Sequence, residues 1–136
     1  MRFLFLSFCF SCYFSFGCVN LISSEERDFS SKDSLAALDA AFVWLEYFDN
    51  SYYDAAWNIS ASILKDLVDQ DLFSHQMGSV KSYYGHTVNR DLKDFFYSEK
   101  LPGAPDGRYF VITFNTTFKN KEQNLEQITP VYENGE

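Results

Sequence analysis

Residues 109–118 read YFVITFNTTF, and this stretch decides the fold class. Its even positions carry Phe, Ile, Phe, Thr and Phe, whereas its odd positions carry Tyr, Val, Thr, Asn and Thr. Successive side chains of a strand point to opposite faces of a sheet, so this alternation is typical of a strand. The stretch therefore predicts a strand whose even-numbered side chains share one face.

Two neighbouring segments also have strand patterns. Residues 88–97 alternate at first and end in the aromatic run Phe-Phe-Tyr, which predicts one long strand that can accommodate a bulge. A third strand is predicted from about 125 to 132, where Pro130 restricts pairing. The turn-rich segments 101–107 (LPGAPDG) and 119–121 (KNK) are predicted to connect the three strands.

The segment before residue 86 has helical periodicity. A first helix is predicted near 32–49, and a second over about 52–67, opened by a capping box of Ser51 and Asp54. A third runs from Asp69 or Asp71 to Gly85, which suits a left-handed C-terminal position. The expected apolar face of the first helix consists of Leu38, Ala41, Phe42, Leu45 and Phe48. About three N-terminal helices on a curved antiparallel sheet make an α+β domain over residues 32–136.

The first 17 residues have the features of a secretory signal peptide. Arg2 supplies the positive end, residues 3–16 are uncharged and apolar, and Gly17 is a small residue at the expected cleavage point. A retained anchor is the alternative, but the run is shorter than the roughly 20 apolar residues that span a bilayer. The sequence therefore predicts an exported protein of the periplasm or cell envelope.

Cysteine usage bears on how the chain is held there. Cys9, Cys12 and Cys18 all lie in or beside the leader, which excludes an internal disulfide framework. Cys18 resembles the lipidated cysteine of a bacterial lipoprotein, although Ser15 stands where a Leu-like residue is usual. Residues 18–31 are polar and Ser-rich, as a flexible tether would be, and a ragged N-terminus explains them equally well.

Charge restricts the classes of partner. The chain has 19 acidic and 11 basic side chains, a net charge of −8, and no basic stripe. Phosphate backbones and anionic lipid surfaces repel such a chain. We expect no nucleic-acid partner, and contact with a membrane only through the signal peptide or a lipid on Cys18.

The C-terminal residues predict that a strand is missing. Asn134 and Gly135 form a strong hairpin signal, yet no strand follows it. We expect that the natural protein continues with at least one more strand. A frayed natural terminus is the alternative.

Several motifs resemble the bacterial family catalogued as domain of unknown function 4019. They are RDLK at 90–93, LPGAPDGRY at 101–109, FNTTFKNK at 114–121, and Glu126. The pair Trp44-Leu45 and residues 53–57 look like the family's helical half, so the resemblance covers roughly 36–133. It implies a small exported or lipid-anchored envelope protein of unassigned activity, with a further strand after the last hairpin.

The expected architecture is similar to two known folds. In the cone-shaped nuclear-transport-factor-like fold and the cystatin-like fold, helices pack on a curved sheet and can enclose a pocket. Fold does not determine function, and other sandwiches of helices on one sheet face stay open.

Most common site chemistries find no support in the sequence. His75 and His86 lie in different predicted elements, which does not suit a zinc site. Phosphate-binding loops, dinucleotide fingerprints and nucleophile elbows are absent from the sequence, so we expect no cofactor. Asp66, Asp69 and Asp71 lack the EF-hand spacing and are better explained as a solvated helix junction.

One polar set is a candidate for acid–base chemistry. His86, Arg90 and Glu126 are predicted to face a shared concavity, where a histidine and a carboxylate can transfer protons as in an isomerase. The alternative is that Arg90 and Glu126 form a cross-strand ion pair and that His86 is a solvated loop residue.

The turn at 101–107 is a candidate binding edge. The predicted ligand- or partner-binding residues are Arg90 of the first strand and, in this turn and its flanks, Tyr97, Pro102, Gly103, Pro105, Asp106 and Tyr109. Aromatic residues dominate protein interfaces, although turn residues more often only reverse the chain. We therefore prefer a non-catalytic envelope module that binds a small apolar ligand or another envelope protein. The alternative is a small acid–base enzyme that uses His86 and Glu126.

Overall fold

The computed structural model describes residues 2–4 and 31–133, and in these ranges the chain forms helices and one antiparallel sheet of order β1-β4-β3-β2. This confirms the predicted α+β class. The elements are β1 (Arg2–Leu4), α1 (Ser31–Asp49), α2 (Tyr53–Asn58), α3 (Ser62–Leu67), α4 (Gln70–Tyr84), β2 (Thr87–Ser98), β3 (Tyr109–Phe118) and β4 (Lys121–Val131).

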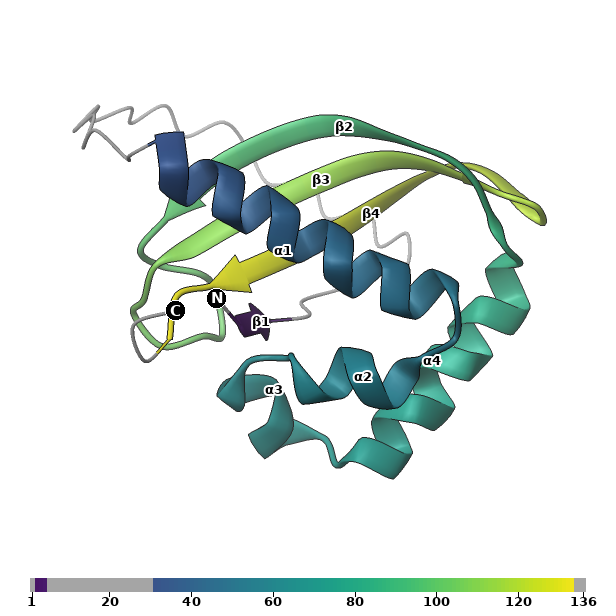
Figure 1. Cartoon of the computed structure of the whole chain (residues 1–136), viewed down its shortest axis with the longest axis horizontal. Helices are drawn as coiled ribbons and strands as arrows, with labels where there is room; N and C mark the ends of the chain where they lie inside the picture. Colours follow the sequence, from purple (N-terminus) through teal and green to yellow (C-terminus); the bar gives the residue numbers. More distant parts are fainter. Residues whose placement is uncertain (1, 5–30, 134–136) are drawn as a thin grey trace.

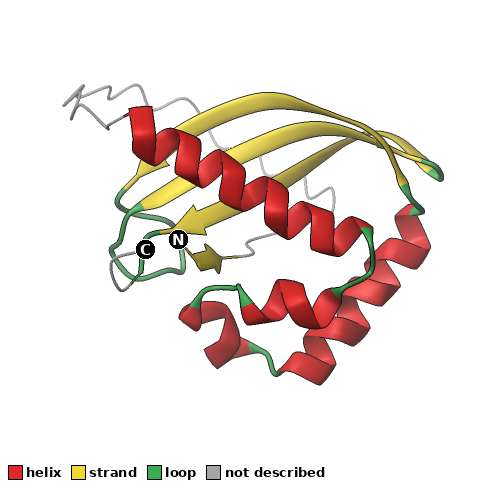
Figure 2. Cartoon of the chain, in the orientation of Figure 1, coloured by secondary structure: helices red, strands yellow, loops and turns green. Residues whose placement is uncertain are grey.

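The helices form one layer against the sheet. Figure 1 shows α1 lying across the face of the curved strands, with α2, α3 and α4 below it. α1 contacts β3 and β4, and α2 contacts both α1 and α4. Figure 2 shows that the helices gather on the concave side of the sheet.

The strand alternation seen in the sequence is confirmed. Phe110, Ile112, Phe114, Thr116 and Phe118 of β3 are all buried. Ile112 is paired with Ile128 of β4, which is also buried, and the long strand β2 has register shifts at Thr87/Asn89 and Leu92/Asp94. β4 begins at Lys121, four residues before the predicted start, because the turn is confined to 119–120.

The core lies between the helices and the inner face of β3 and β4. Trp44 and Phe48 of α1 stack with their ring centroids 5.9 Å apart, and Phe73 of α4 meets Trp44 edge-on. The indole Nε1 of Trp44 donates a hydrogen bond to Ser60 Oγ at 3.2 Å. This buried polar contact fixes the segment between α2 and α3 against α1.

The predicted second helix is wrong in two respects. It is interrupted at residues 59–61, where Ala61 is extended and the Ser60 hydroxyl donates back to Ala56 O at 2.8 Å. The capping box does not form, because Ser51 has φ +62° and the first turn of α2 has no side-chain cap. Gly85 does adopt the predicted positive φ, at +82°, after α4.

Ion pairs fix α1 at both ends. Asp33, in its first turn, lies 3.4 Å from Arg108 beside β3, and Asp49, its last residue, lies 2.8 Å from Arg90 on β2. The rotation of α1 about its axis is thereby set, and with it the choice of side chains that face solvent.

Several sequence predictions concern residues outside the described ranges. These are Cys18, most of the leader and tether, and the Asn134-Gly135 signal. Of the leader, Arg2–Leu4 is described, as the strand β1 that pairs antiparallel with Thr129–Val131 of β4. None of the described helices is long and apolar enough to cross a membrane.

A core substitution tests this packing. We expect Ile112→Ala, at a fully buried position, to lower the free energy of unfolding by about 2–5 kcal/mol, since it removes apolar contacts and leaves a cavity. Leu125→Ala on β4, where the side chain is 46% exposed, should cost about 1 kcal/mol or less. Chemical denaturation measures both. Equal losses for the two variants would contradict the assigned register.

Candidate functional site

The main buried polar group of the described chain lies where the end of α1 meets the sheet. Arg90 of β2 donates from Nη1 to Asp49 Oδ2 at 2.8 Å and from Nη2 to Asp49 Oδ1 at 3.2 Å. It also donates from Nε to Glu126 Oε2 and from Nη2 to Glu126 Oε1, the latter at 3.1 Å. We refer to Asp49, Arg90 and Glu126 as the Arg90 cluster. One guanidinium thus joins the helical layer to two strands.

The Arg90–Glu126 pair spans three strands. Arg90 is on β2 and Glu126 is on β4, with β3 between them. Thr116 of β3 is paired with Arg90 in the register, and its hydroxyl donates to Glu126 Oε2 at 2.9 Å. The side chains of Arg90 and Glu126 are only 11% and 3% exposed. Buried charges of this kind are stable only when they are paired and hydrogen-bonded, and here both carboxylate oxygens of Glu126 have donors.

Two further groups donate hydrogen bonds to Asp49. The Thr87 hydroxyl donates to Asp49 Oδ1 at 2.7 Å, and Lys81 Nζ donates to the main-chain carbonyl of Asp49 at 3.0 Å. In the described residues, no buried side-chain nitrogen or oxygen lacks a hydrogen-bond partner. The cluster is therefore a closed network.

The electrostatics of the cluster favour its charged state. Burial acts against the charged forms of Arg90 and Asp49, but their mutual hydrogen bonds and charges outweigh it. The pKa of the Arg90 guanidinium is held above its usual range, and the pKa of the Asp49 carboxyl is held below its own. A general acid or base works best with a pKa near the operating pH. The shifts of Arg90 and Asp49 instead take both pKa values further from neutral pH.

The structure assembles only part of the predicted acid–base set. Arg90 and Glu126 meet, as in the ion-pair interpretation, whereas the His86 side chain is exposed in the turn between α4 and β2. None of the hydrogen bonds of Glu126 involves His86. His86 instead accepts a hydrogen bond at its main-chain carbonyl from Lys119 N at 2.9 Å. This geometry offers no imidazole–carboxylate pair for proton transfer.

The loop before β3 is held by its own flanking tyrosine. Gly103 has φ +79°, and Gly107 N donates to Glu99 O at 2.9 Å, which closes the loop. The Tyr109 hydroxyl donates to Pro105 O at 2.6 Å, and the tyrosine is only 3% exposed. Tyr109 therefore supports the loop from inside and offers little surface to a partner.

The other proposed loop residues lie nearer the surface. Pro102, Gly103, Pro105 and Asp106 are exposed, while Tyr97 is half-buried with its ring 5.4 Å from that of Phe110. Their exposure is compatible with contact to a partner, and the binding edge stays a prediction.

A pocket of about 280 Å³ adjoins this loop. Pro105 and Asp106 line it from the loop, and Ser62 and Glu133 line it from the opposite side. Glu133 accepts hydrogen bonds from Ser62 N at 3.1 Å and Ser62 Oγ at 2.8 Å. The charged residues among those that line it are Asp66, Asp106 and Glu133, all acidic.

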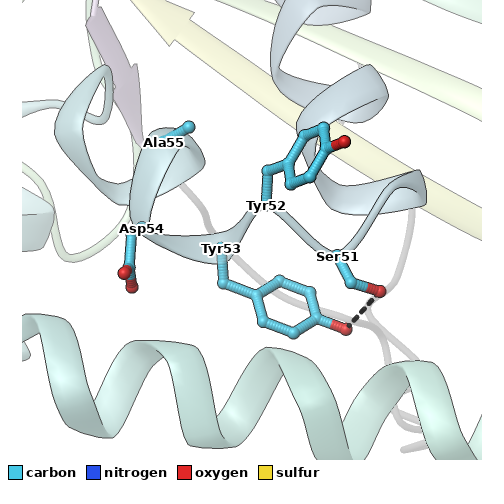
Figure 3. Close-up of a pocket in the computed structure, with 5 residues that line it drawn as sticks. All are labelled: Ser51, Tyr52, Tyr53, Asp54 and Ala55. Atoms are coloured by element: carbon cyan, nitrogen blue, oxygen red, sulfur yellow. Dashed lines mark hydrogen bonds between the residues drawn. The ribbon is translucent and has the colours of Figure 1, made fainter.

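A second pocket, of about 490 Å³, lies at the junction of α1 and α2 (Figure 3). Residues 51–55 line it, and Figure 3 shows the Tyr53 hydroxyl directed at Ser51, to which it donates at 3.2 Å. Asp54 supplies its one carboxylate and accepts a hydrogen bond from Ser74 Oγ at 2.9 Å.

The acidic junction before α4 has a structural role in part. Asp69 caps α4, because its Oδ1 accepts a hydrogen bond from Leu72 N at 2.8 Å. Asp66 and Asp71 are exposed. In the described ranges no three His, Cys, Asp or Glu side chains gather in a way that could hold a metal ion.

An exposed apolar surface on α1 was missed by the sequence reasoning. Leu35, Phe42 and Val43 face solvent, and Phe42 is 51% exposed although its ring lies 5.7 Å from that of buried Phe114. Leu92 of β2 is paired with Phe114 and is 52% exposed. We call Leu35, Phe42, Val43 and Leu92 the outer apolar surface.

The placement of Phe42 on the core face of the first helix was therefore wrong. α1 lies over β3 and β4, so the side of the helix that carries Phe42 is left uncovered near the edge strand β2. The signal in the sequence was Val43, which falls outside the apolar stripe chosen for the core, whereas Leu35, seven residues before Phe42, lies on the same side of the helix as Phe42. A helix with apolar residues on two sides has more than one surface to bury.

The family model described as "Protein of unknown function (DUF4019)" matches residues 40–136. The chain belongs to this family. The DUF4019 match begins within α1 and takes in every later element, so it includes the whole Arg90 cluster and most of the outer apolar surface. No curated protein and no solved structure matches the chain.

The Arg90 cluster makes stability depend on pH. Asp49→Asn should lower the free energy of unfolding by roughly 1–2 kcal/mol at neutral pH, because a charge-assisted contact to Arg90 is lost. A carboxyl whose pKa is lowered by folding stabilises the protein above its unfolded-state pKa, and this contribution disappears as the pH falls through the folded-state pKa.

The difference between wild type and Asp49→Asn should therefore shrink below about pH 4. Denaturation at a series of pH values measures it, with Asp66→Asn as the control for removing an exposed carboxylate. A difference that stays constant down to acid pH would contradict the charged pairing of Asp49.

Proposed function

We propose that this chain is an exported, non-catalytic module that binds another protein through the outer apolar surface. The observation that carries the proposal is the half-exposed ring of Phe42 next to Phe114, whose register partner Leu92 is also half exposed. Helices of water-soluble domains normally keep polar residues on the solvent side, and contiguous exposed apolar residues mark interaction sites.

The absence of a free reactive group in the Arg90 cluster supports a binding role. Glu126 is the buried carboxylate on which an acid–base mechanism would depend, and its oxygens accept from Arg90 and Thr116. His86 lies outside this network. A buried carboxylate whose two oxygens both accept hydrogen bonds is expected in a network that holds elements of the fold together.

The shape of the surface favours a protein over a small apolar ligand. Leu35, Phe42 and Val43 lie along the outside of α1, within a little over two turns of helix. Small ligands are usually held in concave pockets that enclose most of their surface. An outward-facing stripe on a helix suits a partner of comparable size.

The proposed location rests on the leader. Arg2, the apolar run at 3–16 and Gly17 support export and cleavage, and Cys18 would then be the first residue and a site for a lipid anchor. Cleavage after Gly17 would also remove β1 and uncover the Thr129–Val131 edge of β4. We place the mature chain in the periplasm or cell envelope.

Site-specific photocrosslinking tests the binding role. A photoreactive amino acid at position 42 of the full chain, in the cells that make it, should give a discrete adduct with another protein. The same amino acid at Gln76, on the exposed side of α4, should give none. An adduct only with a second copy of this chain, or equal adducts from both positions, would contradict the proposal.

The intact mass of the protein recovered from cell envelopes tests the location. We expect a chain that begins at Cys18, either bare or carrying the added mass of a lipid. A chain that retains residues 1–17 and is recovered from the cytoplasm would contradict export without bearing on the binding surface.

A further inference from the structure

We infer that the partner presents an amphipathic helix with basic residues to the outer apolar surface. This inference rests on the proposed function and adds the chemical class of the partner. It follows from three features of the described chain: the acidic residues beside Phe42, the nature of the β2 edge, and the charge of the protein.

Two exposed carboxylates flank Phe42 on α1. Asp39 lies three residues before Phe42 and Glu46 lies four after it, so both are its neighbours on the helix surface. Neither carboxylate forms an ion pair with a described residue. An apolar centre between unpaired acidic groups complements a partner whose apolar residues are flanked by Lys or Arg.

The β2 edge argues against a partner that adds a strand. β2 is the outermost strand on its side of the described sheet, and it carries register shifts at Thr87/Asn89 and Leu92/Asp94. Charged residues Asp91, Lys93 and Asp94 are exposed along it. Bulges and charges are the devices that protect edge strands from pairing. The accessible contacts are therefore side chains, which a helix packed along α1 can use.

A second copy of the chain fits this surface poorly. In a two-fold dimer built on α1, the Asp39 and Glu46 side chains of both copies would crowd the same interface. Each copy has a net charge of −8, which adds to the repulsion. Of the basic residues of β2, only Lys93 is exposed, and exposed Asp91 and Asp94 lie on the same strand.

Designed peptides provide a direct test. Three amphipathic helical peptides with the same leucine face, and with Lys, Glu or Gln on the polar face, are titrated into the full chain and followed by fluorescence anisotropy. We expect the Lys peptide to bind at least about tenfold more tightly than the Glu peptide, and its affinity to fall with added salt. The Gln peptide should lie between them.

Variants locate the binding. Phe42→Ser should weaken the Lys peptide by at least about tenfold, as for an aromatic residue at the centre of an interface. Leu35→Ser, at a position 61% exposed, gives a second reading with little risk to folding, and thermal denaturation checks both variants. Unchanged affinity in both folded variants would overturn the inference.

A charge reversal with a matched control separates local from overall charge. Asp39→Lys with Glu46→Lys should abolish the preference for the Lys peptide and favour the Glu peptide. Asp66→Lys with Glu122→Lys makes the same change in net charge at exposed positions elsewhere and should keep the original preference.

The outcomes distinguish the inference from the proposed function. Equal binding of all three peptides at the outer apolar surface would overturn the basic partner and leave the binding role intact. Loss of preference in both double variants would show that only net charge is read, which also overturns the inference. Failure of all three peptides to bind, together with no adduct at position 42, would remove the proposed function as well.

Discussion

The buried guanidinium of Arg90 is the constraint on which the rest of this structure depends. A cation placed between a helical layer and a sheet is costly unless carboxylates surround it. Asp49 and Glu126 supply these carboxylates from α1 and β4, which are far apart in the sequence. The hydroxyls of Thr87 and Thr116 donate further hydrogen bonds to Asp49 and Glu126, respectively. The end of α1 therefore has one position on the sheet. Together with the pair of Asp33 and Arg108, this fixes the direction in which each side of α1 faces.

The same constraint separates the polar interior of the protein from its interaction surface. Arg90 and Glu126, two of the three residues proposed as a catalytic set, are hydrogen-bonded to each other and hold the fold together, whereas His86 lies outside this network. The side of α1 that is not drawn against β3 and β4 carries Leu35, Phe42 and Val43 outward. The buried Arg90 cluster and the outer apolar surface thus both follow from the position of α1 on the sheet. The DUF4019 match includes the second half of α1, with Phe42, Val43 and Asp49, and the whole three-stranded part of the sheet formed by β2, β3 and β4.

Patterns of period two and period 3.6 were sufficient to predict most of the architecture. The alternation at 109–118, the turn at 101–107 and the stop at Gly85 depend on local chemistry, and all three are present. The break at 59–61 was not predictable from periodicity, because Ser60 is held there by Trp44, sixteen residues away. The exposure of Phe42 depends on which strands α1 covers, and no local pattern contains that information. Arg90 and Glu126 were recognised as a pair, but the third partner, Asp49, lies 41 residues from Arg90 and carried no signal in the sequence.

Replacing the Arg90 cluster by apolar residues tests the account most directly. Buried ion networks can often be exchanged for hydrophobic residues of similar volume without loss of the fold, whereas removal of one partner leaves an unpaired charge. We predict that Asp49→Leu, Arg90→Met and Glu126→Leu together give a folded protein in which α1 no longer has a single position on the sheet, so that the position-42 adduct is weakened, and that Arg90→Met alone is strongly destabilised. A folded triple variant that forms the adduct as the wild type does would contradict the account, since the position of α1 would then not depend on the cluster.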